Sequence, residues 1–207
     1  MRTCSPPRPG RIDAAHRTCL IARFSYLYAH DRLVAETLLR TCICNMEMVQ
    51  RIIYIAAVES FHAAKAAFRK VKISVKDALA LHHAGPESLE VAALEYIACH
   101  KDLFNVCQCV QAVICCMSSN PKIPCAPEID FCVIRNLIRE LCCLAFLMQT
   151  LVPPLDIAVG EDGEVFNKSM YHRSCDSDFT ASLVAYHKWP ALMERNVVIV
   201  KGEAVTR

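Results

Sequence analysis

The sequence predicts a mainly α protein, a helical bundle of about four to five helices with small β hairpins near the C-terminus. Three observations lead to this class. Hydrophobic residues make up 54% of the 207 positions, which is enough to bury one substantial core. Apolar residues recur at helical spacing up to Thr150, and strand-like alternation begins only after Pro153 and Pro154. Of five glycines, four stand where the apolar pattern breaks: Gly85, Gly160, Gly163 and Gly202.

Residues 12–207 are expected to form a single helical domain. Residues 1–11 are expected to form a disordered leader, because the first ten positions hold three prolines and almost nothing apolar. This leader lacks the apolar run of a signal peptide. Its prolines exclude the amphipathic helix of a mitochondrial transit sequence.

The helical period predicts four helices in order. The first runs from Ile12 to about Thr41, with a break before Leu33 left open. Asn45 is a good N-cap for the second, which should reach about Leu81. The third is predicted over Glu87–Ser118, between two proline-containing turns, and the fourth over Glu128–Thr150.

Shorter elements are predicted after Pro154. Alternation in Leu155–Val159 and a Gly-containing turn before Glu164–Phe166 predict a small hairpin. Phe179–Tyr186 is predicted to be a short helix. Val197–Val200 and Glu203–Thr206, on either side of Lys201-Gly202, predict a terminal hairpin.

The fourteen cysteines are interpreted as reduced thiols that serve mainly as small buried core residues, because many of them sit inside helical apolar patterns. Adjacent or alternate pairs such as Cys115-Cys116 and Cys42/Cys44 point in different directions on a helix, so no metal site is predicted. No segment is expected to span a bilayer: Leu103–Pro121 is interrupted by polar residues and Leu141–Leu155 is too short. Both are interpreted as buried helices.

Charge is divided unevenly along the chain. Residues 1–76 hold thirteen Lys and Arg against five Asp and Glu, a balance of +8, whereas residues 77–207 hold ten against sixteen, a balance of −6. On the second predicted helix Lys65, Arg69, Lys72 and Lys76 occupy a strip about 60° wide and about 16 Å long, and Arg51 projects on the same side. Such a row beside an apolar face suits a phospholipid with two phosphates. The alternative is that these cations form a solvated face whose charge is compensated by acidic residues in the second half of the same chain.

Several segments resemble the mitochondria-eating protein family, over roughly Ile21 to Arg207. The resemblance is carried at the C-terminal end by Arg173–Phe179, Trp189–Glu194 and Val200–Arg207, and upstream by Met48–Ala56 and Pro153–Ala158. It implies a non-enzymatic factor in mitochondrial quality control and mitophagy that self-associates in its full-length form and engages cardiolipin. It also implies a cytoplasmic protein recruited to mitochondria, with outer-membrane proteins as partners. Since that family carries coiled-coil segments ahead of this domain, the chain is expected to be a fragment.

Other residues in these segments allow two interpretations. Trp189-Pro190 should bend the chain, with Trp189 as a core plug rather than an interfacial anchor. Arg173, Asp176 and Asp178 either form a polar network lining a groove or cap the following helix. Lys201 is grouped with this C-terminal motif because it lies in Val200–Arg207.

No catalytic site or cofactor is predicted. Cys99-His100 and His82-His83 are consecutive pairs, whose side chains diverge by about 100° on a helix. The acidic turn near Asp162 lacks the EF-hand spacing, although a weak calcium site there stays open. Nucleic-acid binding is not expected, because the basic region lacks interleaved aromatic residues. The leading hypothesis is lipid binding by the basic strip, and the alternative is protein interaction or self-association without lipid.

Overall fold

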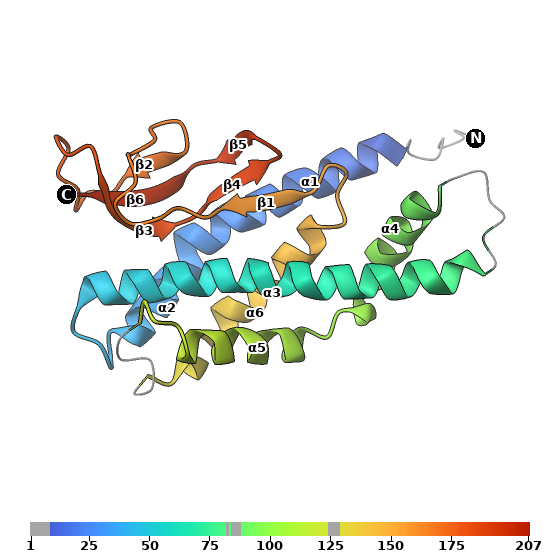
Figure 1. The fold of residues 1–207 in the computed structure, drawn as a ribbon, viewed down its shortest axis with the longest axis horizontal. Helices are drawn as coiled ribbons and strands as arrows, with labels where there is room; N and C mark the ends of the chain where they lie inside the picture. The colour runs from blue at the N-terminus through green and yellow to red at the C-terminus, as the bar shows by residue number, and fades with distance from the viewer. Residues whose placement is uncertain (1–8, 82, 84–87, 124–128) are drawn as a thin grey trace, which may run out of the picture.

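The centre of the fold is α3 (Met46–Ala80), a helix of 35 residues. The computed structural model describes residues 9–81, 83, 88–123 and 129–207. Asn45 caps α3, since its side-chain oxygen accepts a hydrogen bond from Met48 N at 3.2 Å. This confirms the predicted start, and the end at Ala80 confirms the predicted extent. Figure 1 shows α3 crossing the full length of the molecule, with the strands on one side and α5 on the other.

The N-terminal region is a continuous helical path that is α-helical at both ends and π-helical over one turn between them. α1 (Pro9–Tyr26) passes through a π-helical turn, η1 (Leu27–Asp31), into α2 (Arg32–Leu39). The break left open before Leu33 is therefore this π turn. Phe24, Leu27 and Leu39 are fully buried along this path. The part of the predicted leader in residues 1–8 lies outside the described residues, and α1 already begins at Pro9.

The single third helix predicted over Glu87–Ser118 is wrong. The chain forms α4 (Leu89–Cys99), a 3₁₀ turn η2 (Lys101–Leu103) and α5 (Val106–Ser118). Asn105 caps α5 by accepting from Gln108 N at 3.0 Å, which competes with a continuous helix. The turn brings Phe104 against Phe146, with ring centroids 4.2 Å apart. Packing of the half-buried Phe104 on the buried Phe146 favours the break at this position.

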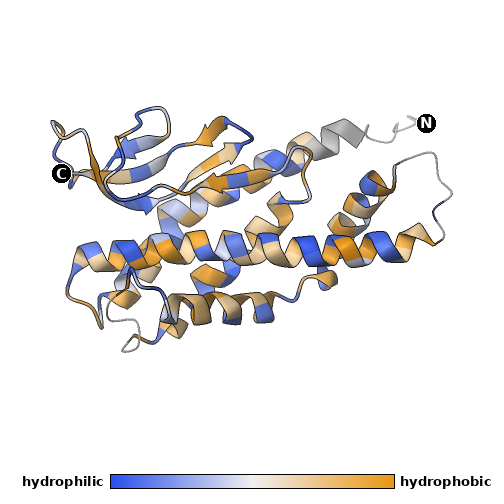
Figure 2. Cartoon of the chain, in the orientation of Figure 1, coloured by the Kyte–Doolittle hydropathy of each residue, from blue (hydrophilic) through white to orange (hydrophobic). Residues whose placement is uncertain are grey.

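The fourth predicted helix is shorter than Glu128–Thr150. A 3₁₀ turn, η4 (Phe131–Ile134), precedes α6 (Arg135–Met148). Residues 124–128, which include the predicted start at Glu128, lie outside the described residues. α6 packs against α3 and α5. Within the described residues no helix is long and apolar enough to cross a membrane. Figure 2 shows apolar and polar residues alternating around α3, as expected for a helix packed on one side.

The described C-terminal residues form two three-stranded sheets in place of the predicted hairpins. The first sheet has the order β1-β4-β5, and the second has the order β2-β6-β3. β1 pairs antiparallel with β4, β4 with β5, and β6 with β3, while β2 and β6 run parallel. The strands are β1 (Leu155–Ala158), β2 (Tyr171–Arg173), β3 (Val184–Trp189), β4 (Ala191–Glu194), β5 (Val197–Val200) and β6 (Gly202–Thr206).

Both hairpin predictions identified strands but paired them wrongly. Val165 forms only an isolated bridge with Leu183, and it does not return along β1. β5 and β6 belong to different sheets, so Lys201-Gly202 is a crossing point and not a hairpin turn. A Cβ at Gly202 would lie 2.4 Å from Trp189 O. The glycine is therefore needed for close backbone packing against the neighbouring crossing.

The predicted helix over Phe179–Tyr186 is also wrong, since β3 begins at Val184. Val184, Tyr186 and Trp189 are buried, and such β-branched and aromatic residues favour a pleated surface. The predicted class is thus confirmed in its main feature, a mainly helical chain with small β structure near the C-terminus. The helices, the first sheet and Trp189 of the second sheet share one core, which includes Phe24 and Phe61.

Candidate functional site

Four of the five cations predicted to bind lipid contact carboxylates of this chain. Arg51 pairs with Glu47 at 3.1 Å and also with Asp162. Lys65 pairs with Asp156 on β1. Lys72 and Lys76 share Glu90 of α4, the latter at 2.9 Å. These contacts correspond to the alternative interpretation, in which acidic residues of this chain compensate the charge of the basic strip.

The same ion pairs bear on the weak calcium site that the sequence analysis considered at the acidic turn near Asp162. Asp156 and Asp162 face cations of α3. These two carboxylates are already paired with cations, which weakens the attraction of the turn for a calcium ion. No group of three or more His, Cys, Asp or Glu able to hold a metal ion occurs within the described part of the chain.

Arg69 differs from the other strip residues, because it is exposed and forms no ion pair in the part of the chain that the structure describes. Lys70 beside it is likewise exposed and without a carboxylate partner there. Ile73 lies one turn further on, with 61% of its surface exposed. We call Arg69, Lys70 and Ile73 the α3 outer patch. Asp77, one turn beyond Ile73, is exposed on the same side.

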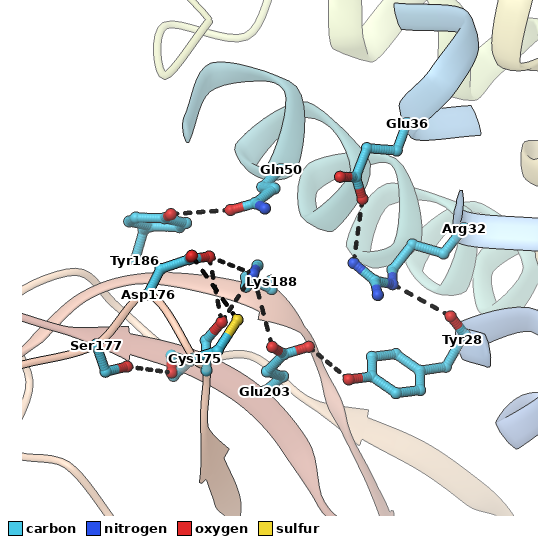
Figure 3. Close-up of polar contacts among 12 residues, drawn as sticks. Tyr28, Arg32, Glu36, Gln50, Cys175, Asp176, Ser177, Tyr186, Lys188 and Glu203 are labelled. Atoms are coloured by element: carbon cyan, nitrogen blue, oxygen red, sulfur yellow. Dashed lines mark hydrogen bonds and ion pairs between the residues drawn. The ribbon is translucent and has the colours of Figure 1, made fainter. Parts of the chain in front are cut away.

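A second polar cluster surrounds Lys188 on β3 (Figure 3), whose side chain is only 6% exposed. Its Nζ lies 2.7 Å from Ser174 Oγ and 2.8 Å from an oxygen of Asp176. Glu203 Oε1 is 3.6 Å away, and the Tyr28 hydroxyl donates a hydrogen bond to the other Glu203 oxygen at 2.5 Å. The cluster therefore joins the second sheet to η1 of the helical path.

The carboxylates of this cluster are shaped by their ion pairs. The hydrogen bond and charge of Lys188 lower the pKa of Asp176. Burial raises the pKa of Glu203, but the hydrogen bond from Tyr28 and the charge of Lys188 outweigh it and lower the pKa overall. Lys188 thus contacts both carboxylates as well as Ser174 Oγ. The cluster is an internal ion-pair network between the second sheet and η1.

The other residues predicted as a C-terminal motif make local contacts. Arg173 Nη1 donates to Asp178 O and to Thr206 Oγ1, each at 2.8 Å. Asp178 accepts from Thr180 N at 2.8 Å, and Lys201 Nζ donates to Lys168 O at 2.6 Å. Capping of a following helix by Asp176 or Asp178 is wrong, because the next element is β3. The bonds of Arg173 hold the segment that ends at Asp178 against Thr206 of β6.

Trp189 is a core residue, as predicted. It is almost fully buried, with its ring centroid 5.7 Å from that of Phe24 and 5.8 Å from that of Tyr28. Pro190 separates β3 from β4, and the chain passes there from one sheet to the other. The predicted bend at Trp189-Pro190 is this crossing.

Sequence reasoning missed a cavity of about 320 Å³ beside Arg51, lined by residues that include Tyr54, Lys122 and His187. His187 is almost fully buried, stacked on Tyr54 with centroids 5.4 Å apart. Its Nε2 lies 3.1 Å from Glu164 Oε1, without the alignment of a hydrogen bond. Burial lowers the pKa of His187, although the charge of Glu164 opposes this. No pattern in the sequence marks this histidine, because its surroundings come from distant segments.

The prediction that the cysteines are mainly buried is wrong. Among the described residues they are free, but only Cys109 and Cys142 are buried and Cys143 is half-buried. On α5, Val110, Val113 and Met117 turn inward, which leaves Cys107, Cys115 and Cys116 on the exposed side. The helix has an apolar inner face that includes Cys109, and its other three thiols lie outside that face.

Comparisons with known proteins match most of the chain to one family. The family model described as "Mitochondria-eating protein" matches residues 16–206. The "Mitochondria-eating protein" of Gallus gallus is 58% identical over 200 residues, covering 97% of this chain and 42% of that protein. That of Homo sapiens is 54% identical over 207 residues, covering 100% and 38%, and that of Danio rerio is 51% identical over 203 residues, covering 98% and 41%. The chain thus spans about two fifths of the length of these relatives. No solved structure matches it.

Proposed function

This chain belongs to the mitochondria-eating protein family, and we propose on that premise that it is a non-enzymatic, mitophagy-related domain that binds anionic mitochondrial lipid. Cardiolipin, which carries two phosphates, is the proposed lipid. The relatives' name supports a role connected with mitochondria. The proposal places the protein in the cytoplasm, recruited to the mitochondrial outer membrane, and the binding surface on α3.

The observation that carries this proposal is the α3 outer patch. Arg69 and Lys70 project from neighbouring positions without a carboxylate partner in the described residues, and exposed Ile73 lies beside them. A basic group near an anionic bilayer surface contributes about 1 kcal/mol, and an exposed isoleucine adds apolar contact with the acyl boundary. The patch therefore offers both contributions that interfacial binding needs.

The paired cations are expected to contribute less. Lys65, Lys72 and Lys76 retain between 28% and 38% of their side-chain exposure, so lipid phosphates can reach them. A phosphate at these positions must displace Asp156 or Glu90. Since each existing pair offsets part of the gain, the patch is proposed as the primary contact and the strip as a secondary one.

The test is flotation with vesicles of phosphatidylcholine containing cardiolipin, using Arg69→Glu/Lys70→Glu. We expect binding to fall by about tenfold or more, because the variant converts two attractive charges into two repulsive ones. Arg139→Glu/Lys168→Glu is the matched control, since both residues are exposed and lie outside α3. Asp77→Lys should increase binding. Equal flotation of all these proteins would remove the patch from the mechanism.

The share of the paired cations can be measured separately. Glu90→Gln frees Lys72 and Lys76, whereas Glu95→Gln changes net charge equally at an exposed position of α4 that has no ion pair in the described residues. If the strip contacts lipid, Glu90→Gln should bind cardiolipin vesicles several-fold more tightly than Glu95→Gln. Identical binding would restrict the contact to the patch.

A protein-interaction module without direct lipid binding is the second candidate. It is favoured by the internal neutralisation of Arg51, Lys65, Lys72 and Lys76. In that case cardiolipin vesicles should not recruit the wild-type chain above pure phosphatidylcholine vesicles. Concentration-dependent sedimentation without lipid would then identify self-association as the activity, as proposed for the full-length protein.

A further inference from the structure

β5 has a free edge. In the sheet order β1-β4-β5 it pairs only with β4. Within the described residues Val197–Val200 form no bridge and no backbone hydrogen bond other than those of this ladder. Figure 1 shows β5 as the outermost strand of its sheet. One row of its N–H and C=O groups is thus available to another strand.

The sequence of β5 is that of a strand which accepts a neighbour. Its four residues are Val, Val, Ile and Val, all β-branched, with no charge and no proline. Natural edge strands are usually protected by a very short length, a charge, a proline or a covering element, and of these β5 has only its short length within Val197–Val200. Val197 is instead 61% exposed. Ile199 and Val200 pack partly against the core, which holds the strand in place for pairing.

The charges at the ends of β5 indicate what kind of strand fits. Within the described part of the chain, Arg195 at one end is exposed and has no carboxylate partner, and Lys201 at the other end bonds only to the Lys168 carbonyl. A second copy of this chain would bring Arg195 close to Lys201 in an antiparallel pair, which is repulsive. A partner with acidic residues at both ends of an apolar stretch would instead meet a cation at each end.

We propose that the free edge of β5 binds an extended apolar segment with acidic flanks from a partner protein, by β-strand addition. The main-chain bonds along Val197–Val200 supply affinity, and Arg195 with Lys201 supplies the preference for acidic flanks. This surface lies on the sheet and does not depend on the proposed lipid contact of α3.

The probe is a fluorescein-labelled peptide, Glu-Thr-Val-Val-Thr-Val-Glu, and a matched peptide with lysine in place of both glutamates. Fluorescence anisotropy with the 207-residue chain should show saturable binding of the acidic peptide, at least fivefold tighter than that of the lysine peptide. Arg195→Glu/Lys201→Glu should reverse the order of preference. Amide exchange should slow at Val197–Val200 when the peptide is bound.

A backbone variant tests the mode of binding. Val198→Pro removes a strand N–H and should abolish binding. Val159→Pro is the control for an exposed valine outside β5, and circular dichroism checks that both variants fold. Absence of saturable peptide binding, or equal affinity for both peptides, would overturn the proposal. A dimer of the unliganded chain that Val198→Pro dissolves would also overturn it, because the occupant would then be a second copy.

Discussion

Replacing Lys188 by methionine tests whether the polar cluster holds the second sheet to the helices. The ammonium ion contacts Ser174, Asp176 and Glu203, and its side chain is 6% exposed. Lys188→Met keeps the length of the side chain but removes its charge. The variant therefore leaves the two carboxylates near one another without their cation.

The expected loss follows from how buried each partner is. Removing one member of a buried ion pair costs about 3–5 kcal/mol. Here Asp176 is 52% exposed and regains water, whereas Glu203 is 14% exposed and keeps the Tyr28 hydrogen bond without its nearest cation. We therefore expect the free energy of unfolding to fall by about 2–4 kcal/mol. Adding Glu203→Gln should recover about 1–2 kcal/mol of this, because it removes the uncompensated charge.

Equilibrium unfolding in guanidinium chloride measures these values, with far-ultraviolet circular dichroism as the signal. Fluorescence of Trp189, the single tryptophan, is a second probe. Lys168→Met is the control, since the same change at an exposed lysine should stay within about 0.5 kcal/mol of wild type. An unchanged midpoint for Lys188→Met, or strictly additive effects in the double variant, would refute the reasoning.

Two further predictions concern the cavity. Burial lowers the pKa of His187 below its ordinary 6.5, so the unfolded chain binds a proton at this residue more readily than the folded chain, and stability is lost as the pH falls below 6.5. His187→Asn should therefore flatten the pH dependence of the denaturation midpoint between pH 6.5 and 5.5. Parallel curves for the variant and the wild type would contradict this. Gly160→Ala should destabilise by about 1–3 kcal/mol, because its Cβ would lie 2.3 Å from His187 Nε2 and the buried ring cannot move away. An unchanged thermal midpoint for Gly160→Ala would show that the ring moves freely.

Elements set by local chemistry were predictable from the sequence. The start of α3 follows from the Asn45 cap, and its length from a continuous helical period without glycine or proline. The side of α3 that carries the cations also follows from that period. The partners of those cations do not: Glu90 is 14 residues from Lys76, Asp156 is 91 from Lys65, and Asp162 is 111 from Arg51. Only the tertiary fold brings these carboxylates together with α3.

Strand pairing was beyond prediction for a similar reason. Local sequence identified β1, β5 and β6 as strands, but their partners depend on two crossings between the sheets. One crossing is at Pro190, and the other is at Gly202, whose backbone packs on Trp189 O. A glycine between two apolar runs is equally typical of a hairpin turn, so the sequence cannot distinguish the two arrangements. The contact that decides between them is long-range.

The ion pairs change how the lipid hypothesis has to be tested. Lys65 and Arg51 tie α3 to Asp156 and Asp162, which belong to the sheet region, so they contribute to the fold as well as to surface charge. Reversing every cation of the strip would place like charges in contact at both positions and weaken the packing of the sheet on α3. Loss of vesicle binding by such a variant would then report loss of structure. Arg69 and Lys70 have no such partners among the described residues, and substitutions there change the electrostatic surface while leaving these internal contacts in place.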